Sequence, residues 1–180
     1  MNGKMKAQFL RAAFALGTLA VLGALVAELT QPATVRAEKA RLKSPAPAWE
    51  LKDVEGKLVK SADFKGKVVI LDFWATWCGP CRMEIPGFVS LQKKYGKDGL
   101  VIVGVSLDDE GATVLKPFIK KHSINYTVVL GDEKVSKAFG GVDALPTTFI
   151  IDRTGLIVSQ HVGYAPEATF AKEIKPLLKQ

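Results

Sequence analysis

The sequence contains very few of the residues from which metal and haem sites are built. Among its 180 residues are two cysteines, Cys78 and Cys81, and two histidines, His122 and His161. A structural zinc site needs four such ligands, and both histidines lie far from the cysteine pair in sequence. Covalent haem attachment requires a histidine directly after the second cysteine, where this chain has Arg82. The sequence therefore predicts neither a metal site nor a bound cofactor.

Acidic residues are absent from the first 27 residues. A basic stretch ends at Arg11, and an uncharged, largely apolar run follows from Ala12 to Ala27. This order is typical of a secretory signal peptide or a membrane anchor, although the run is short for a full span unless Arg11 reaches the interface. No cysteine lies nearby, which excludes a lipoprotein anchor. We interpret residues 1–27 as a targeting segment, and prefer an uncleaved anchor to a signal peptide removed after Ala27 or Ala37.

The targeting segment predicts both the domain organisation and the compartment. We expect residues 28–44 to be a linker and residues 45–180 to form one domain, since 48% hydrophobic residues suffice for a substantial core. The domain would then lie outside the cytoplasm, where a dithiol depends on an electron donor to stay reduced. The net charge of +7 is spread over scattered lysines without interleaved aromatic residues, so no nucleic-acid site is predicted.

The two cysteines lie in the most informative stretch, residues 68–86. Its apolar run from Val68 to Phe73 predicts a strand buried on both faces in the middle of a parallel or mixed sheet. Cys78 and Cys81 follow, separated by Gly79 and Pro80, and a helical pattern begins there. In a first helical turn this spacing places both sulfurs on one side, close enough to bond.

The position of this pair predicts redox chemistry. A helix N-terminus stabilises an anion, so the pKa of Cys78 is expected to be lowered and its thiolate able to attack a disulfide. Cys81, one turn further on, is expected to be more buried and to resolve a mixed disulfide. A redox-inert structural disulfide is the alternative, but it would close a loop too short to stabilise the chain much. We therefore expect a dithiol/disulfide couple.

The remaining pattern alternates strands and helices. The domain opens with a short hairpin, in which residues 49–51 pair with residues 58–59. Further strands are expected at residues 100–106, 127–130, 147–152 and 156–161, and helices at residues 79–95, 113–121, 133–139 and 166–178.

These motifs closely resemble the thioredoxin family. The resemblance comprises Asp72-Phe73-Trp74-Ala75, Trp77-Cys78-Gly79-Pro80-Cys81, Pro86, and Leu145-Pro146-Thr147-Thr148-Phe149. The additional helix, strand and helix between Ser106 and Pro146, together with Glu84, are similar to the TlpA/ResA group of extracytoplasmic thioredoxins. The resemblance implies an α/β, thioredoxin-like fold, with a central mixed β-sheet flanked by helices, an N-terminal β-hairpin and a central αβ insertion.

The resemblance also implies roles for particular residues. Asp72 would be a buried acid with a raised pKa that exchanges protons with Cys81, although an edge position or a structural hydrogen bond is the alternative. Glu84 would take part in proton transfer or be an ordinary helix-surface carboxylate, and we expect it to be wetter and less shifted than Asp72. Pro146 would be cis and lie against the disulfide, unless it is an ordinary loop proline. Substrate would bind at these residues: Trp77, Gly79, Pro80, Leu145 and Pro146.

The function implied is that of an extracytoplasmic thiol-disulfide oxidoreductase. It would reduce disulfides in exported proteins such as apocytochrome c, and a membrane electron donor would re-reduce it. A thiol peroxidase is a second hypothesis, although the proline and threonine that peroxiredoxins carry before the reactive cysteine are replaced here by Leu71 and Ala75. A third is a thioredoxin-fold binding or chaperone module with a static disulfide.

Overall fold

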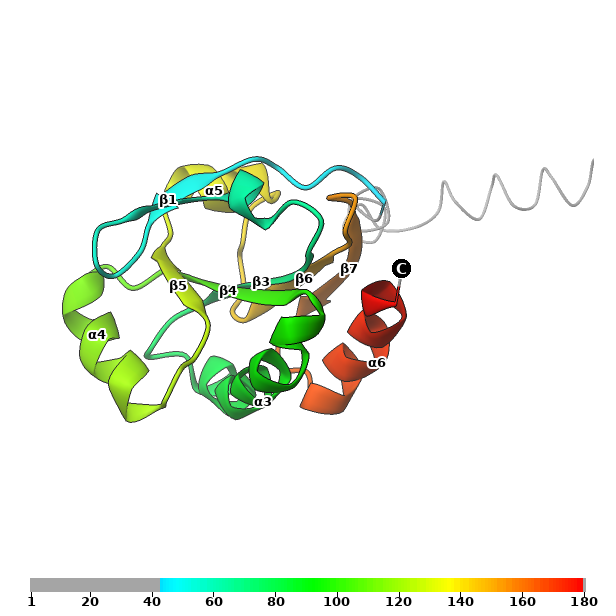
Figure 1. The fold of residues 1–180 in the computed structure, drawn as a ribbon. Coiled ribbons are helices and arrows are strands. Elements are labelled where there is room, and N and C mark those ends of the chain that lie inside the picture. The colour runs from blue at the N-terminus through cyan, green and yellow to red at the C-terminus, as the bar shows by residue number, and fades with distance from the viewer. Residues whose placement is uncertain (1–42, 180) are drawn as a thin grey trace, which may run out of the picture. The chain divides into compact units, whose positions relative to one another are not determined.

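The computed structural model describes residues 43–179, whose centre is a five-stranded mixed sheet (Figure 1). Its strands are β3 (Val68–Trp74), β4 (Leu100–Ser106), β5 (Thr127–Leu130), β6 (Thr147–Ile151) and β7 (Ile157–Val162). They lie in the order β5, β4, β3, β6, β7. The β3–β4 and β4–β5 pairs are parallel, whereas the β3–β6 and β6–β7 pairs are antiparallel. The mixed sheet predicted from the sequence is confirmed.

Helices and a small hairpin cover the two faces of this sheet (Figure 1). One face carries α3 (Gly79–Tyr95), α4 (Ala112–Lys121) and α6 (Glu167–Leu178). The other carries α5 (Glu133–Ala138) and the hairpin of β1 (Glu50–Lys52) and β2 (Leu58–Lys60). Two short 3-10 helices, η1 (Ser61–Phe64) and η2 (Gly96–Asp98), precede β3 and β4. The predicted hairpin and the predicted insertion between β4 and β6 are both present.

β3 is buried along its whole length, as its uninterrupted apolar run predicts. Because side chains alternate along a strand, Leu71 and Phe73 pack into the core beneath the hairpin and α5, whereas Val68 and Ile70 pack beneath α3 and α6. Asp72 shares the register of Val68 and Ile70. Its carboxylate is therefore directed towards the α3 face of the sheet.

Arg153 closes the end of the sheet at which β3 and β4 begin. It lies in the turn between β6 and β7, and its guanidinium donates hydrogen bonds to four backbone carbonyls, those of Gly66 (2.8 Å), Asp98 (3.1 Å), Leu177 (3.3 Å) and Leu178 (3.0 Å). The turn before β3, the turn before β4 and the C-terminus of α6 thus meet at one side chain. We call this region the basal end.

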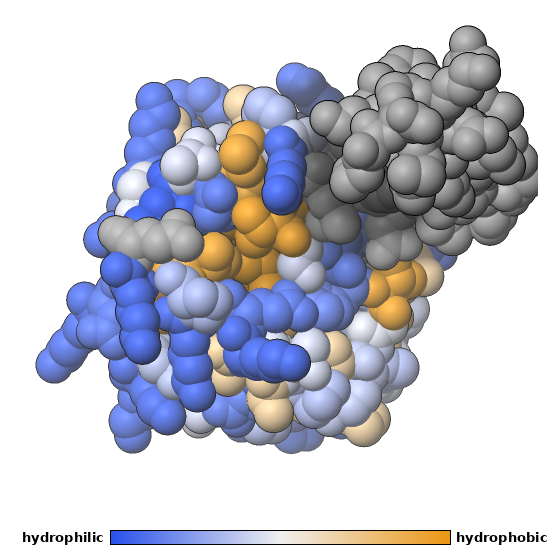
Figure 2. All heavy atoms as spheres, turned by 90° about the vertical axis from the view of Figure 1, so that its right-hand side faces the viewer, coloured by the Kyte–Doolittle hydropathy of each residue, from blue (hydrophilic) through white to orange (hydrophobic). Residues whose placement is uncertain are grey.

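The described chain enters the domain beside the basal end. The backbone of Lys43 and Ser44 pairs with Ile157, and the Ala46 N–H donates to the Gly155 carbonyl. The predicted targeting segment, residues 1–27, and the predicted linker as far as residue 42 lie outside the described residues. Within residues 43–179, no helix is both long and apolar enough to cross a membrane. On the β7 and α6 side of the molecule, hydrophilic residues surround a narrow hydrophobic strip (Figure 2).

Candidate active site

Cys78 and Cys81 are joined by a disulfide at the start of α3, with their Cα atoms 5.3 Å apart. The predicted pairing is confirmed. Cys78 is the N-cap residue of the helix, Gly79 is its first residue, and Pro80 lies within the first turn. Proline suits this turn because its missing N–H would have no partner inside the helix. Both cysteines are buried, with Cys81 (2% exposed) only slightly more so than Cys78 (5%).

The Cys78 sulfur accepts a hydrogen bond from a helix N–H. The Cys81 amide donates to the Cys78 Sγ at 3.2 Å, which is the bond that an N-cap side chain makes. After reduction, the same amide and the positive end of the helix macrodipole would stabilise a thiolate on Cys78. Cys81 lies inside the helix and lacks this position. The geometry therefore distinguishes an attacking sulfur from a resolving one.

Asp108 holds the loop that leads from β3 to the disulfide. Its carboxylate accepts hydrogen bonds from the Thr76 N–H (3.0 and 3.1 Å), the Thr76 hydroxyl (2.6 Å) and the Ser106 hydroxyl (2.8 Å). Asp108 is buried and follows β4, the parallel neighbour of β3. Sequence reasoning missed this residue, although a serine and an aspartate two residues apart at the end of a buried strand were a usable signal.

Asp72 of β3 and Glu84 of the disulfide helix α3 both face the interior between the sheet and the helix, and each is 4% exposed. An Asp72 carboxylate oxygen accepts a hydrogen bond from the Thr148 hydroxyl of β6 at 3.0 Å. Glu84 Oε1 accepts from the Ala165 N–H at 2.6 Å, whereas Glu84 Oε2 is buried without a hydrogen-bond partner among the described residues. Glu84 is therefore far more buried than a helix-surface carboxylate, and its exposed fraction equals that of Asp72. Its backbone partner lies 81 residues away in sequence, before α6.

Burial raises the pKa of both carboxyls. The pKa of Asp72 lies well above its usual value, first because of desolvation and then because of the negative charge on Glu84, while the Thr148 hydrogen bond opposes the shift. Desolvation raises the pKa of Glu84 to about 7, and the Ala165 N–H opposes that shift. That Glu84 is the less shifted of the two stays a prediction. Two buried acids whose charges influence each other titrate as a coupled pair.

Tyr126, which sequence reasoning also missed, faces this acidic pair. Burial raises the pKa of its phenol, and the charges of Asp72 and Glu84 raise it further. Its ring packs edge-on against Phe88 of α3. No sequence pattern marked it, because it lies in the connection that leads into β5 and meets the carboxyls only in the folded chain.

A cleft of about 560 Å³ opens beside Cys78 and contains most of the predicted substrate-binding residues. Trp77, 69% exposed, forms one side with Gly79 and Pro80, and Leu145 forms another. The Leu145–Pro146 peptide bond is cis, as expected.

The backbone around this bond differs from the expectation in one respect. The Pro146 carbonyl accepts a hydrogen bond from the Gly163 N–H at 2.8 Å and is not free for substrate. The N–H and carbonyl of Leu145 make no hydrogen bond within residues 43–179. Leu145, rather than Pro146, therefore offers the backbone groups with which an extended peptide could pair.

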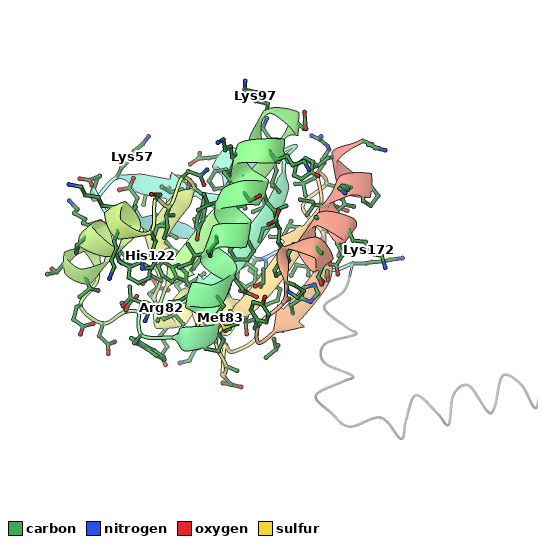
Figure 3. All side chains as sticks on the ribbon, turned by 90° about the horizontal axis from the view of Figure 1, so that it is seen from below. Lys57, Arg82, Met83, Lys97, His122 and Lys172 are labelled. Carbon is green, nitrogen blue, oxygen red and sulfur yellow. A yellow bond between two sulfur atoms is a disulfide. The ribbon has the colours of Figure 1, made fainter. Side chains whose placement is uncertain are left out.

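Exposed apolar side chains occur near the disulfide as well as in the cleft. Met83 follows Cys81 by two residues and is 62% exposed, while Val162 and Tyr164 flank Gly163, whose N–H contacts Pro146. Met83 and Arg82 lie together at the N-terminal end of α3 (Figure 3). No sequence pattern indicated this surface, because single exposed apolar residues on helices and strand ends are common.

Both histidines make side-chain contacts with neighbouring residues. His161 is half-buried, hydrogen-bonds Ser159 and Glu173, and packs edge-on against Phe170. His122 stacks on Phe118 and lines a hollow of about 500 Å³ that also contains Trp77 and Arg82. Across residues 43–179, no three potential metal ligands converge.

Comparison with known proteins agrees with this geometry. The AhpC/TSA family matches residues 42–160. The thiol-disulfide oxidoreductase ResA of Bacillus thuringiensis (strain Al Hakam) is 38% identical over 128 residues, which cover 70% of this chain and 72% of that protein. ResA of Bacillus subtilis is 38% identical over 126 residues, 69% of each chain.

Solved structures give the same result. A thiol:disulfide interchange protein of the thioredoxin family from Chlorobium tepidum superposes with a TM-score of 0.70 at 36% identity, over 76% of this chain and 97% of the other. The family match at residues 42–160 includes β3 and the helix that carries the disulfide. We conclude that the chain belongs to the AhpC/TSA family and is a thiol-disulfide oxidoreductase of the ResA kind.

Proposed function

We propose that this oxidoreductase acts as a reductase outside the cytoplasm and transfers two electrons to disulfides in exported proteins. The Cys78 thiolate attacks one substrate sulfur, and the other substrate sulfur leaves and takes up a proton. Cys81 then loses its proton and attacks the Cys78 sulfur, which releases the second substrate thiol and forms the Cys78–Cys81 disulfide. The observation that carries the proposal is this disulfide at the helix N-terminus beside an open cleft.

Apocytochrome c before haem attachment is the proposed substrate class. Support comes from the similarity to ResA proteins and from the shape of the site, since the cleft is open and Leu145 presents backbone groups to it. Such a substrate presents its own Cys-x-x-Cys disulfide in an unfolded segment. An unfolded segment could approach Cys78 in an extended conformation and pair with Leu145.

A membrane electron donor is the proposed source of the two electrons. The Gly79-Pro80 dipeptide between the cysteines is that of thioredoxin, which lies at the reducing end of the thiol–disulfide range. Such a couple stays reduced outside the cytoplasm only if a donor supplies electrons continuously. The predicted anchor in residues 1–27 would keep the domain at the periplasmic or outer face of the cytoplasmic membrane, within reach of that donor.

Asp72 is the proposed proton acceptor for Cys81, and Glu84 assists it. Asp72 lies on β3 under the disulfide helix, Glu84 lies on that helix three residues after Cys81, and burial raises the pKa of both carboxyls, that of Glu84 to about 7. A raised pKa is what a general base for a thiol requires, because proton transfer is most efficient when the pKa of the base lies near the working pH.

A trapping experiment tests the function. The Cys81→Ser variant, mixed with an oxidised peptide containing Cys-x-x-Cys-His, should accumulate a disulfide between Cys78 and the peptide that intact-mass spectrometry detects. The reduced wild-type chain should instead release the reduced peptide. A scrambled peptide with separated cysteines serves as the matched control for substrate class.

Two outcomes would contradict the proposed function. If neither peptide forms an adduct or is reduced, the disulfide is static. If the reduced chain consumes hydrogen peroxide faster than it reduces either peptide, the chain is a peroxidase.

A further inference from the structure

The basal end gathers basic side chains from separate parts of the chain. The Arg153 guanidinium binds the carbonyl between Lys65 and Lys67, the carbonyl next to Lys97, and the carbonyl next to Lys179. Three lysine-bearing segments that are distant in sequence are thereby held around one cation. All four lysines are exposed.

Neighbouring turns add to this charge. Lys93 and Lys94 occupy the last turn of α3, which leads into η2, and Lys175 occupies the last turn of α6. Lys43, the first described residue, pairs with the start of β7. The acidic residues on the same turns are Asp63, Asp98 and Asp152, and the Asp152 carboxylate is occupied by Thr154 and Leu156. The basal end is therefore strongly positive.

The basal lysines lack acidic partners within residues 43–179. The lysines that form ion pairs there are Lys60, Lys116 and Lys137, and none of these belongs to the basal end. Lysines in the last turns of α3 and α6 are explained by the negative end of each helix macrodipole, which attracts cations. The macrodipole does not explain Lys65 and Lys67, because they lie in the turn before a strand. An unpaired cluster of this kind is a surface for an external anion.

We propose that the basal end lies against an anionic phospholipid surface. Two observations favour a membrane over other polyanions. The described chain begins at this end, and the preceding 42 residues include the apolar run Ala12 to Ala27. A hollow of about 620 Å³ opens beside Lys65 and Lys67 and is lined by apolar residues of the entering chain, Pro45, Ala46 and Pro47, which suits the boundary between headgroups and acyl chains.

This contact would orient the enzyme on the membrane. Lys97 lies near one end of α3, whereas Arg82 and Met83, next to the disulfide, lie at the other end (Figure 3). With the basal end on the lipid, the disulfide cleft faces away from the membrane and towards exported proteins. The proposal rests on the proposed location of the enzyme but not on its substrate, and its test does not use activity.

Lysine protection on lipid vesicles tests the proposal. The full-length chain is mixed with vesicles of phosphatidylcholine alone or with added phosphatidylglycerol, and amine acetylation is quantified at each lysine by mass spectrometry. On the anionic vesicles, acetylation of Lys65, Lys67 and Lys97 should slow about tenfold, while that of Lys134 on α5 should not change. Raising the salt from about 0.1 M to about 1 M, which shortens the Debye length from about 10 Å to about 3 Å, should restore their reactivity.

Two triple variants separate local contact from net charge. Lys65→Glu/Lys67→Glu/Lys97→Glu should abolish the protection of two other basal lysines, Lys93 and Lys179, since each basic residue adds substantially to attraction by an anionic leaflet. Lys52→Glu/Lys134→Glu/Lys172→Glu changes the net charge equally and should keep it. Equal protection on both vesicle types, or equal loss in both variants, would overturn the proposal. Protection that requires added membrane proteins would assign the surface to a protein partner and would also overturn it.

Discussion

The pair Asp72 and Glu84 at the disulfide end and Arg153 at the basal end differ in how fully their polar atoms are hydrogen-bonded. At the disulfide end, Asp72 has one hydroxyl donor, and Glu84 leaves one buried oxygen without a partner among the described residues. At the basal end, Arg153 satisfies four carbonyls, and the charged lysines around it are exposed to solvent. Buried polar groups without partners cost stability. The contrast indicates that Arg153 stabilises the fold at the basal end. At the disulfide end, the buried carboxyls lower the free energy of unfolding but are available for proton transfer.

The largest effect is expected from the cysteines themselves. Cys78→Ser should lower the rate of disulfide exchange roughly a thousandfold or more, because it removes the nucleophile at the helix N-terminus. Cys81→Ser should leave the first attack intact and stop the second. Stopped-flow mixing with an oxidised peptide, followed by quenching and mass spectrometry, measures the two steps separately. If alkylation of the reduced protein labels Cys81 before Cys78, the two roles are reversed.

The buried acids should make stability depend on pH. Their pKa values are higher in the folded than in the unfolded chain, so the folded state binds more protons and the free energy of unfolding falls as pH rises through this window. For Glu84 the window runs from its usual pKa of 4.5 to about 7, which corresponds to a loss on the order of 3 kcal/mol. Glu84→Gln keeps the acceptor for the Ala165 N–H and should flatten the curve.

Denaturant unfolding of the oxidised protein at several pH values between about 4.5 and 8 measures this effect. Asp72→Asn should flatten the curve in the same direction, because the pKa of Asp72 is also raised. Glu110→Gln, a substitution of an exposed carboxyl that makes no hydrogen bond or ion pair within residues 43–179, is the matched control and should leave the slope unchanged. A wild-type protein that gains stability as pH rises through this range would contradict the raised pKa values.

Arg153 should matter for stability and not for exchange. Arg153→Gln removes most of the donors that hold Gly66, Asp98 and the end of α6, and it should lower the free energy of unfolding by about 2 kcal/mol. The rate of peptide reduction at 25 °C should stay within about twofold of wild type, since the disulfide lies at the other end of β3 and α3. A matching loss of exchange rate would show that the two ends are coupled.

The smallest effect is expected for proton transfer. Asp72→Asn should slow resolution of the mixed disulfide about tenfold, less than a lone general base would contribute, because Glu84 can take over part of its role. Glu84→Gln should slow it less. Single-turnover kinetics across pH 5 to 9 measures both variants. The assignment fails if Asp72→Asn leaves the rate and its pH profile unchanged while Glu84→Gln alters them.

Sequence alone predicted the features that depend on local pattern. The apolar run from Val68 to Phe73 predicted the central strand, and the Cys78–Cys81 spacing predicted the bond at the start of α3. Resemblance supplied the cis bond before Pro146, which no propensity indicates. The strand and the disulfide could be predicted because each depends on residues within a few positions of one another in the sequence.

Features that depend on chain crossings could not be predicted in this way. Glu84 was expected to be wet because a charged residue on a helix usually is, and the Ala165 N–H that covers it comes from a segment 81 residues away. The basal lysines are scattered in the sequence. Only the fold brings Lys65, Lys97 and Lys179 together, because Arg153 binds the backbone carbonyls of the residues next to them. Residues that are distant in sequence and meet only in the folded chain produce no periodic pattern in the sequence.

The clamp of Asp108 on Thr76 has a consequence for the speed of the reaction cycle. Thr76 is two residues before Cys78, and both its N–H and its hydroxyl are bound by one carboxylate. The conformational entropy of this loop is therefore lost once, during folding, and not again in each turnover. The Thr76–Asp108 hydrogen bonds do not involve either sulfur, so we expect the loop before Cys78 to keep its conformation when the disulfide opens and not to reorder in each cycle.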